Sequence, residues 1–265
     1  MKTIDNKIKY YELLMCYDDT SKYKKYELPK GFHYSFYKPG DELDWVDIHI
    51  KSGEFTSIEQ GLEWFHKFYD YFLDDLYRRC IFIVDDETNE KVATVTVSLL
   101  KKKEYGYEAA IDWLAIKKEY QGRGLAKPLI SKFIELSKEL GYKKIMLHTQ
   151  TTTWLAVKLY LDLGFEILNK EEINGWNIIK TLTNHEKLSD YKCVSKDEIF
   201  DKRNIEIEKI LINIFGTDKF NYNVWHKDNQ HSVYVYNNNQ TYEYEYYYIN
   251  GKIELREVKH KKYNK

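Results

Sequence analysis

The stretch EYQGRGLAKPLISKF, residues 119–133, constrains the fold more than any other part of the chain. It joins a strand-like run ending near Ile116 to a helix-like run that begins near Leu125 and stops at Gly141. A second strand-like run, KKIMLHTQ, follows the helix. A strand, a crossover helix and a second strand in this order form a βαβ unit, whose two strands are parallel. The sequence therefore predicts an α/β architecture built around this unit.

The turn itself holds two glycines and no bulky apolar side chain. Gly122 and Gly124 allow positive φ angles and let a ligand approach the main chain. Pro128 is tolerated only in the first helical turn, so the amides of residues 122–127 should have no partner within the helix. Phosphate groups bind readily to such amides. A tight turn without a ligand uses the same residues, and the chain has neither a Walker A sequence nor the third small residue of the Rossmann pattern.

Further elements are expected on both sides of this unit. Apolar and β-branched runs predict strands at residues 10–16 and 32–37, then a meander of CIFIVDD, KVATVTVSLL and YEAAIDWLAI. Helices are predicted over DELDWVDIHIKSG, from Ser57 (with Gln60 as a capping box) through Leu76, and over TTWLAVKLYLDL. The runs FEIL and WNIIKTL are predicted to be two final strands.

The pattern of predicted elements changes near Asn184. Ser195 and Glu198 form a capping-box pattern that predicts one helix running to Gly216. Asn250-Gly251 is a hairpin signal. Counting outward from that turn gives the cross-strand pairs Tyr248–Ile253, Tyr246–Leu255 and Glu245–Arg256. We expect a main domain over residues 8–183 and a small α+β domain of unknown role over residues 184–265.

Composition argues against several classes of partner and site. The 265 residues carry a formal net charge of −1, so bulk charge does not favour nucleic acid or an anionic membrane as the main partner. Three widely spaced cysteines, Cys16, Cys80 and Cys193, argue against a disulfide framework or a metal site. The first residues lack the apolar segment of a secretion signal. We therefore expect a cytoplasmic protein without a bound metal.

Two motifs resemble a known family. The block DWLAIKKEYQGRGLAKPLISKFIELSKELGY resembles the cofactor-binding core of the GNAT superfamily of N-acetyltransferases, whose hallmark Gln/Arg-x-x-Gly-x-Gly/Ala is matched by residues 121–126. A second family element appears at Ala156, Leu159, Tyr160, Gly164 and Phe165. The resemblance covers about residues 8–183 and implies a mixed central sheet flanked by helices. The stretches LPKGFHYSFYKPGDELDW and LHTQTTTWLAVKLYLDLGF resemble a branch of the family that does not by itself define an acceptor.

This resemblance implies acetyl-CoA as the acyl donor. Its pantetheine arm is expected along the main chain of Leu114, Ala115 and Ile116. Its pyrophosphate is expected on Gln121, Gly122, Arg123, Gly124, Leu125, Ala126 and Lys127. Thr153 stands where many members place an asparagine that contacts the cofactor, and its hydroxyl offers a replacement for that contact.

Acetyl transfer to nitrogen requires that one proton leave the amine and that another reach the departing sulfur. The resemblance makes Tyr160 the candidate acid for the thiolate. Strand alternation places Glu108, Ala110, Asp112, Leu114 and Ile116 on one face, and Ala110 stands where some members carry a catalytic glutamate. We take Asp112 as the candidate base, with Glu108 and His148 as alternatives. Asp41, Glu42, Asp44 and Trp45 are candidates for the acceptor pocket.

The leading interpretation is an N-acetyltransferase that moves an acetyl group from acetyl-CoA to a small-molecule or peptide amine by direct attack. The alternative is a non-catalytic module that binds acyl-CoA or a partner protein. A third interpretation makes the C-terminal domain a nucleic-acid platform, from its basic end KHKKYNK and from the aromatic residues Trp225, Tyr234, Tyr236, Tyr242, Tyr244 and Tyr246. The sequence leaves a homodimer open.

Overall fold

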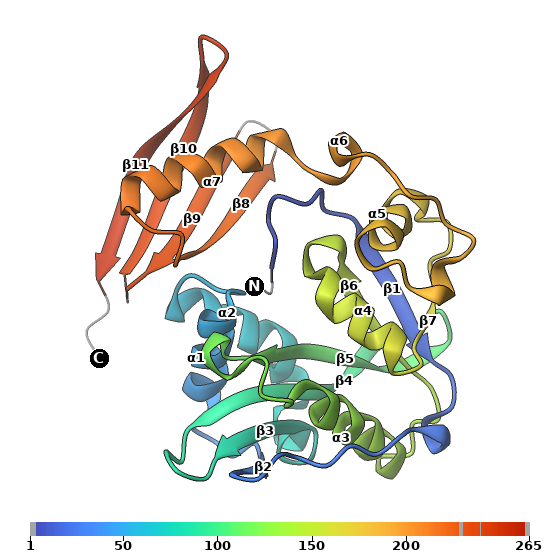
Figure 1. Ribbon diagram of the computed structural model, residues 1–265. Coiled ribbons are helices and arrows are strands. Elements are labelled where there is room, and N and C mark those ends of the chain that lie inside the picture. Colours follow the sequence, from blue (N-terminus) through green and yellow to red (C-terminus); the bar gives the residue numbers. More distant parts are fainter. Residues whose placement is uncertain (1–3, 228–229, 239, 263–265) are drawn as a thin grey trace.

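The structure is a computed structural model that describes residues 4–227, 230–238 and 240–262. It contains a seven-stranded sheet in the order β2-β3-β4-β5-β6-β1-β7 and a four-stranded sheet in the order β11-β10-β9-β8. Figure 1 shows helices around the first sheet and the second sheet as a separate layer. The predicted mixed α/β fold with a smaller helix-and-sheet part is confirmed.

The strands of the first sheet are β1 (Glu12–Tyr17), β2 (Phe32–Phe36), β3 (Cys80–Asp85), β4 (Lys91–Glu104), β5 (Tyr107–Ile116), β6 (Ile145–Gln150) and β7 (Glu166–Ile167). Its helices are α1 (Glu42–Ser52), α2 (Ile58–Tyr69), α3 (Ala126–Glu139), α4 (Trp154–Asp162) and α5 (Ile173–Thr183). Short 3-10 turns occupy Thr20–Lys22, Asp70–Arg78, Lys118–Tyr120, Thr151–Thr153 and Glu186–Leu188.

The predicted meander and βαβ unit are both present. Strands β3, β4 and β5 pair in antiparallel fashion, and β5 pairs with β6 in parallel across helix α3. The parallel pairing holds at only two positions, Ala110↔Met146 and Ile111↔Leu147. Beyond Ile111 the two strands are no longer paired, so the middle of the sheet is open there.

Strand β5 carries a bulge at Trp113. Its φ is 52°, and the pairing with β4 shifts between Thr96↔Asp112 and Thr94↔Ala115. A bulge adds one residue to one strand and so reverses the side on which later side chains lie. The predicted alternation is therefore wrong after Asp112. Leu114 belongs to the same apolar core as Ile111, whereas Trp113 belongs to the core on the opposite face.

Two apolar cores cover the two faces of the first sheet. One is formed with α3 and α4 and includes Leu129, Phe133 and Val157; the other is formed with α1 and α2. The predicted Ser57 cap is present, because its Oγ accepts from the Gln60 amide at 3.1 Å. The Gln60 side chain accepts from the Thr56 amide instead of closing the box on Ser57.

Of the two final strands predicted for this part, one is wrong and the other is shorter than predicted. WNIIKTL lies in helix α5 and not in a strand, and FEIL contributes only the two residues of β7. The Glu172 side chain caps the helix by accepting from the Gly175 amide at 3.3 Å. Gly175 lies so close to β1 that a Cβ there would come within 2.8 Å of Leu13. Trp176 and Ile179 are buried at helical spacing, a period that an apolar run this short conceals.

The helix predicted from Ser195 to Gly216 is interrupted. The capping box forms, but α6 covers only Lys196–Ile199, because Phe200 is extended and its segment pairs with Ile8. Helix α7 (Lys202–Phe215) starts anew with Asp201 as its cap. Ile199 packs with Ile8 and with α5, whereas α7 packs on the second sheet. The division at residues 183 and 184 stays a prediction, and this packing favours a later crossing near Phe200.

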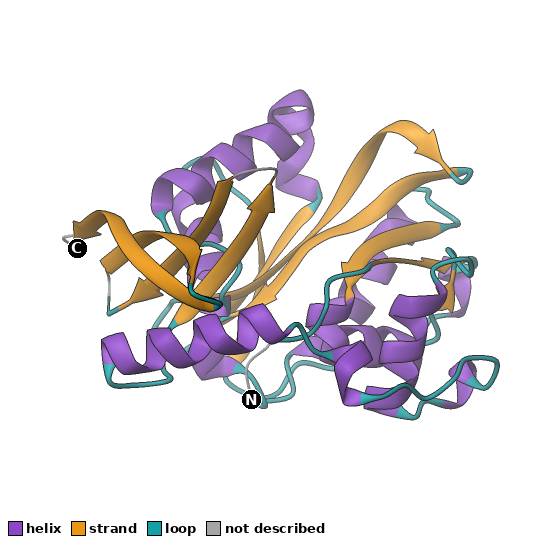
Figure 2. Ribbon diagram, turned by 90° about the horizontal axis from the view of Figure 1, so that it is seen from above, coloured by secondary structure: helices purple, strands orange, loops and turns teal. Residues whose placement is uncertain are grey.

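The second sheet consists of β8 (Asn221–Lys227), β9 (Gln230–Asn237), β10 (Gln240–Ile249) and β11 (Lys252–Lys262). All three cross-strand pairs predicted for its hairpin are confirmed. Figures 1 and 2 show α7 along this sheet. Tyr244 and Tyr246 are buried in its core with Leu211, so they do not form an exposed stacking surface. The Trp225 side chain and residues 263–265 lie outside the described residues.

The other face of the second sheet contacts the connection between α1 and α2. Asn221 Nδ2 donates to the Ile50 carbonyl at 3.0 Å, and Asn223 Nδ2 donates to the Glu54 carbonyl at 3.1 Å. The Thr241 hydroxyl donates to the Thr56 carbonyl. Tyr236 packs against the α1–α2 core. Side chains of the second sheet therefore bind main-chain groups of this connection.

A buried lysine at the end of β5 is expected to be important for stability. Lys117 is 2% exposed, and its Nζ lies 2.6 Å from Asp47 and 2.5 Å from Glu90. Lys117→Met removes the buried one of the two lysines that pair with these carboxylates, so we expect the free energy of unfolding to fall by about 3 kcal/mol. Urea denaturation measures this loss.

The matched control is Lys51→Met. Lys51 pairs with the same two carboxylates, at 2.9 and 3.4 Å, but its side chain is 32% exposed. Solvent screening should limit its loss to about 1 kcal/mol or less. Equal losses for the two variants would contradict the importance assigned to burial.

Within the described residues, no helix combines the length and the apolar character that a bilayer crossing requires.

Candidate active site

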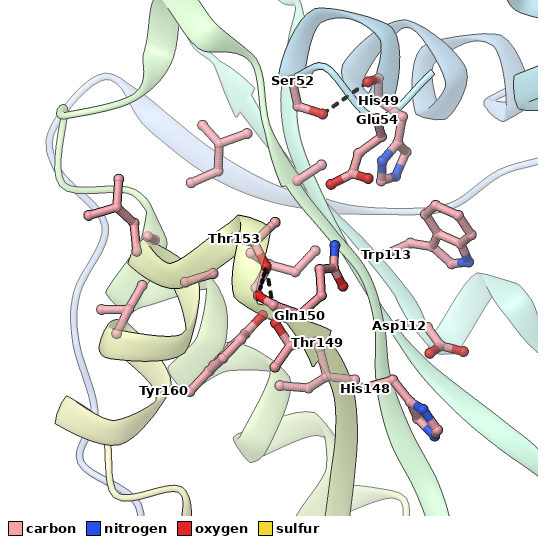
Figure 3. Close-up of a pocket in the computed structure, with 18 of the residues that line it drawn as sticks. His49, Ser52, Glu54, Asp112, Trp113, His148, Thr149, Gln150, Thr153 and Tyr160 are labelled. Carbon is pink, nitrogen blue, oxygen red and sulfur yellow. Dashed lines mark hydrogen bonds between the residues drawn. The ribbon is translucent and has the colours of Figure 1, made fainter. Parts of the chain in front are cut away.

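A cavity of about 1450 Å³ lies where β5 and β6 separate. It is lined at one end by the glycine turn and at the other by α1, α2 and the residues between them. Figure 3 shows Tyr160 from α4 and Thr153 on one side, and Trp113 and Asp112 from β5 on the other. Residues from both faces of the first sheet thus meet in one continuous space.

The glycine turn has the conformation that the sequence predicts. Gly122 and Gly124 have φ angles of 77° and 83°, and α3 begins at Ala126 without a side-chain cap. Among the described residues, none accepts a hydrogen bond from the amides of residues 122–127. A Cβ at Gly122 would meet no atom within 4 Å, so the space in front of the turn is open. Unpaired amides at a helix start are suitable donors for a phosphate group.

Six of the seven residues predicted for the pyrophosphate site line the cavity, and Arg123 does not. The Arg123 guanidinium instead lies 4.4 Å from the centre of the Tyr120 ring. Gln121 connects the turn to β5, because its Nε2 donates to the Ile116 carbonyl at 2.9 Å. Lys127 lines the rim.

The edge of β5 predicted to hold the pantetheine arm also lines the cavity. Leu114, Ala115 and Ile116 are all present in the wall. On one side this segment pairs with β4 through Ala115↔Thr94 and Ile116↔Ala93. On the side facing β6 it has no strand partner among the described residues. An extended ligand can add to such an edge through main-chain hydrogen bonds.

Tyr160 enters the cavity from α4. It is 6% exposed, its ring lies 5.4 Å from that of Phe165, and its hydroxyl binds no described residue. Burial, and secondly the negative charge of Glu54, raise the pKa of Tyr160, so the phenol stays protonated at neutral pH. Thr153 is already engaged, since its Oγ1 donates to the Gln150 carbonyl at 3.0 Å and lies 3.2 Å from Thr149 Oγ1.

Of the candidate bases predicted from the sequence, Asp112 and His148 line the cavity and Glu108 does not. Burial raises the pKa of Asp112 to about 6, against the lowering effects of Ser98 and His148. His148 Nδ1 lies 2.9 Å from a Glu12 carboxylate oxygen. Figure 3 places Asp112 and His148 together, away from Glu54.

The acidic residues predicted for the acceptor pocket lie elsewhere. Lys91 Nζ lies 2.6 Å from both Asp41 and Asp44, Glu42 accepts from the Tyr37 hydroxyl, and Trp45 is fully buried in the α1–α2 core. None of these four residues lines the cavity. That prediction is wrong, because the start of α1 points to the β3–β4 side and only its end reaches the cavity.

Two residues that were not predicted from the sequence line the cavity near the end of α1. They are His49, on the last turn of the helix, and Glu54, directly after the Gly53 cap. Neither belongs to a motif of the family named above, and each occurs singly among many similar polar residues. The only local signal was Gly53, which marks where α1 stops.

Comparisons with known proteins define the class. Residues 45–165 match the sequence profile of the acetyltransferase (GNAT) family. The chain is 30% identical over 130 residues to the uncharacterized protein YyaT of Bacillus subtilis, covering 48% of this chain and 80% of YyaT. It is 30% identical over 86 residues to N-acetyltransferase 8B of Rattus norvegicus, covering 32% of this chain. It spans 39% of that rat protein and 28% of the human protein of the same name.

A solved structure agrees in fold. The GCN5-related N-acetyltransferase from Sphaerobacter thermophilus superposes with a TM-score of 0.50 at 16% identity, covering 62% of this chain and 50% of that chain. The chain therefore belongs to the GNAT family. The resemblance drawn from the turn and from the Tyr160 region is confirmed at the level of the family and its fold.

Proposed function

We propose that the protein transfers an acetyl group from acetyl-CoA to an amine by direct attack of the amine nitrogen. One observation carries the proposal. The unpaired amides of residues 122–127, the free edge of β5 and the Tyr160 hydroxyl all open into a single cavity. Membership of the GNAT family supports acyl transfer in general, and the cavity supports the assignment of roles.

The residues present suit acetyl-CoA. The amides of the turn and the Lys127 ammonium suit a pyrophosphate, since both donate hydrogen bonds to anionic oxygen. The main chain of Leu114 to Ile116 suits the amide groups of a pantetheine arm. When bound, acetyl-CoA supplies an activated acyl group as a thioester.

The roles of the remaining side chains follow from their protonation. Tyr160 keeps its proton at neutral pH, so it is suited to protonate a departing thiolate. Apolar residues around it exclude water from the thioester. A carboxylate on the acceptor side is required to remove the proton of an ammonium group, and the cavity offers more than one.

The direct test is turnover with a panel of amines. Purified protein is incubated with acetyl-CoA and phenethylamine, spermidine, an amino acid or a peptide, while thiol release and acetylated product are measured. We expect thiol release that depends on the amine and is matched by acetylated product. Binding of acetyl-CoA without turnover of any amine would favour the non-catalytic module, and absence of binding would contradict both interpretations.

A further inference from the structure

The last turn of α1 and the residues after it bring two polar side chains, His49 and Glu54, into the cavity. The Glu54 amide donates to the His49 carbonyl at 2.9 Å, so the turn holds these two residues together. Among the described residues, none binds the Glu54 carboxylate or either ring nitrogen of His49. His49 is 0% exposed. Figure 3 shows both side chains entering the cavity from the same corner. Buried polar groups normally have partners, so this corner is suited to a polar ligand.

The charges at this corner suit an amine. Burial raises the pKa of Glu54 to about 7 and lowers the pKa of His49 to about 3. His49 is therefore neutral, and Glu54 is ionised in about half of the molecules near pH 7. Burial is the only cause of the Glu54 shift. The other titratable residues that line the cavity are Tyr10, Glu12, His49, Lys67, Tyr71, Asp112, Lys118, Tyr120, Lys127, His148 and Tyr160.

Glu54 and Tyr160 share one space although they come from opposite faces of the sheet. The charge of Glu54 contributes to the raised pKa of Tyr160, whereas no such effect connects Asp112 to Tyr160. An acid and a base that act on one reaction centre must both reach it. Glu54 meets this requirement better than Asp112.

The wall beside this corner is aromatic. The Trp113 ring, turned to this side by the bulge in β5, lies 5.3 Å from the ring of His49, 5.8 Å from that of Trp64 and 5.2 Å from that of Phe68. All four residues line the cavity. Aromatic rings bury apolar groups well and attract cations to their faces.

We infer that this corner is the acceptor subsite, that it takes a primary amine carried on an apolar or aromatic body, and that Glu54 receives the proton of its ammonium group. The inference rests on the proposed function. His49 accepts a second N–H of the amine, and the rings of Trp64, Phe68 and Trp113 hold the apolar body.

The proton transfers balance. The ammonium gives one proton to the Glu54 carboxylate, and the free amine nitrogen forms a bond to the thioester carbon. The carbon–sulfur bond then breaks. Tyr160 gives its proton to the leaving sulfur and regains one from the nitrogen, so an amide and a free thiol result. Glu54 releases its proton to solvent before the next turnover.

The second sheet determines where Glu54 lies. Asn223 Nδ2 donates to the Glu54 carbonyl at 3.1 Å. Asn221 Nδ2 makes the same kind of bond within α1, to the Ile50 carbonyl and not to Glu54. Asn223 is thus a positioning residue, and the C-terminal part of the chain serves the acceptor subsite.

The first test is Glu54→Gln, assayed with acetyl-CoA and phenethylamine. We expect kcat/KM to fall on the order of 100-fold at pH 8. In the unaltered protein kcat/KM should fall as the pH drops below about 7, because Glu54 must be ionised, and this dependence should vanish in the variant. Acetyl-CoA affinity should be unchanged, which shows that the variant folds. Glu63→Gln, an exposed carboxylate on α2, is the matched control.

The outcomes separate this inference from the proposed function. If the unaltered protein acetylates none of the amines, both the proposed function and the acceptor subsite are wrong. Two other outcomes overturn the acceptor subsite alone. One is that Glu54→Gln acetylates amines as fast as the unaltered protein. The other is that the fall of kcat/KM at low pH disappears in Asp112→Asn but remains in Glu54→Gln.

The second test compares amines that share a primary amino group but differ in the apolar group attached to it. We expect kcat/KM for phenethylamine to exceed that for ethylamine by roughly 30-fold, because the ring is buried against Trp64, Phe68 and Trp113. Trp64→Ala should remove most of this difference, because it should lower kcat/KM for phenethylamine far more than kcat/KM for ethylamine. Preference for spermidine over phenethylamine would overturn the apolar class of acceptor.

The third test is Asn223→Ala. Loosening the Glu54 main chain should admit water, lower kcat roughly tenfold and move the acid-side dependence to lower pH, with KM for acetyl-CoA unchanged. Asn221→Ala loses the same kind of bond, but to Ile50, and should leave the pH dependence in place. If kcat/KM of Asn223→Ala depends on pH as it does in the unaltered protein, Asn223 is only a structural contact and does not position Glu54.

Discussion

Tyr160→Phe is expected to lower kcat by about 100- to 1000-fold while leaving the affinity for acetyl-CoA unchanged, the range typical of the loss of a general acid. The phenol is buried, keeps its proton and has no hydrogen-bond partner among the described residues. Phenylalanine preserves the packing on Phe165 and removes only the proton donor. Steady-state kinetics with thiol detection, together with calorimetry, measure the two quantities.

Tyr17→Phe is the matched control for this variant. The Tyr17 ring also packs on Phe165, at 5.1 Å, but its hydroxyl donates to the Lys22 carbonyl and does not line the cavity. It should cost stability without a large change in kcat. Full activity of Tyr160→Phe would remove Tyr160 from the mechanism.

Gly122→Val is expected to weaken acetyl-CoA binding on the order of 100-fold. Gly122 has a φ of 77°, a conformation that a β-branched residue adopts only with strain. The turn must therefore rearrange, and its amides then no longer point together at the pyrophosphate. Loss of one or two hydrogen bonds to a charged group accounts for a change of this size.

The control for Gly122→Val is Gly141→Val at the far end of α3. Gly141 has a φ of 89°, and a Cβ there would also meet no atom within 4 Å. Both variants carry the same backbone strain, so both should lose similar stability. Equal loss of acetyl-CoA affinity in the two variants would mean that strain alone, and not the site, explains the effect.

The parts of the fold that depend on local rules were predictable. The glycine turn, the helix after it and the Asn250-Gly251 hairpin are set by backbone conformations that few residues adopt. Strand periods and caps likewise located β3, β4, β5 and the start of α2. The cofactor half of the candidate site lies on these elements, so its residues could be named from the sequence.

The acceptor half depends on tertiary structure and could not be predicted. The bulge at Trp113 has no glycine to mark it, yet it turns that ring to the acceptor side. Glu54 is one of many acidic residues, and its place in the cavity depends on the turn that ends α1 and on the bond from Asn223 of the second sheet to that turn. WNIIKTL is predicted as a strand but lies in helix α5, because burial against β1 leaves a short apolar run whose period is ambiguous.

The central claim is that the main-chain amides of residues 122–127 hold the pyrophosphate of acetyl-CoA. The most direct measurement uses protein labelled with ¹⁵N at its 12 glycines and titrated with coenzyme A while the amide resonances are followed. Saturable shifts of the Gly122 and Gly124 signals, with those of Gly31 and Gly141 unmoved, are the predicted result. Binding of coenzyme A that leaves Gly122 and Gly124 undisturbed would contradict the account.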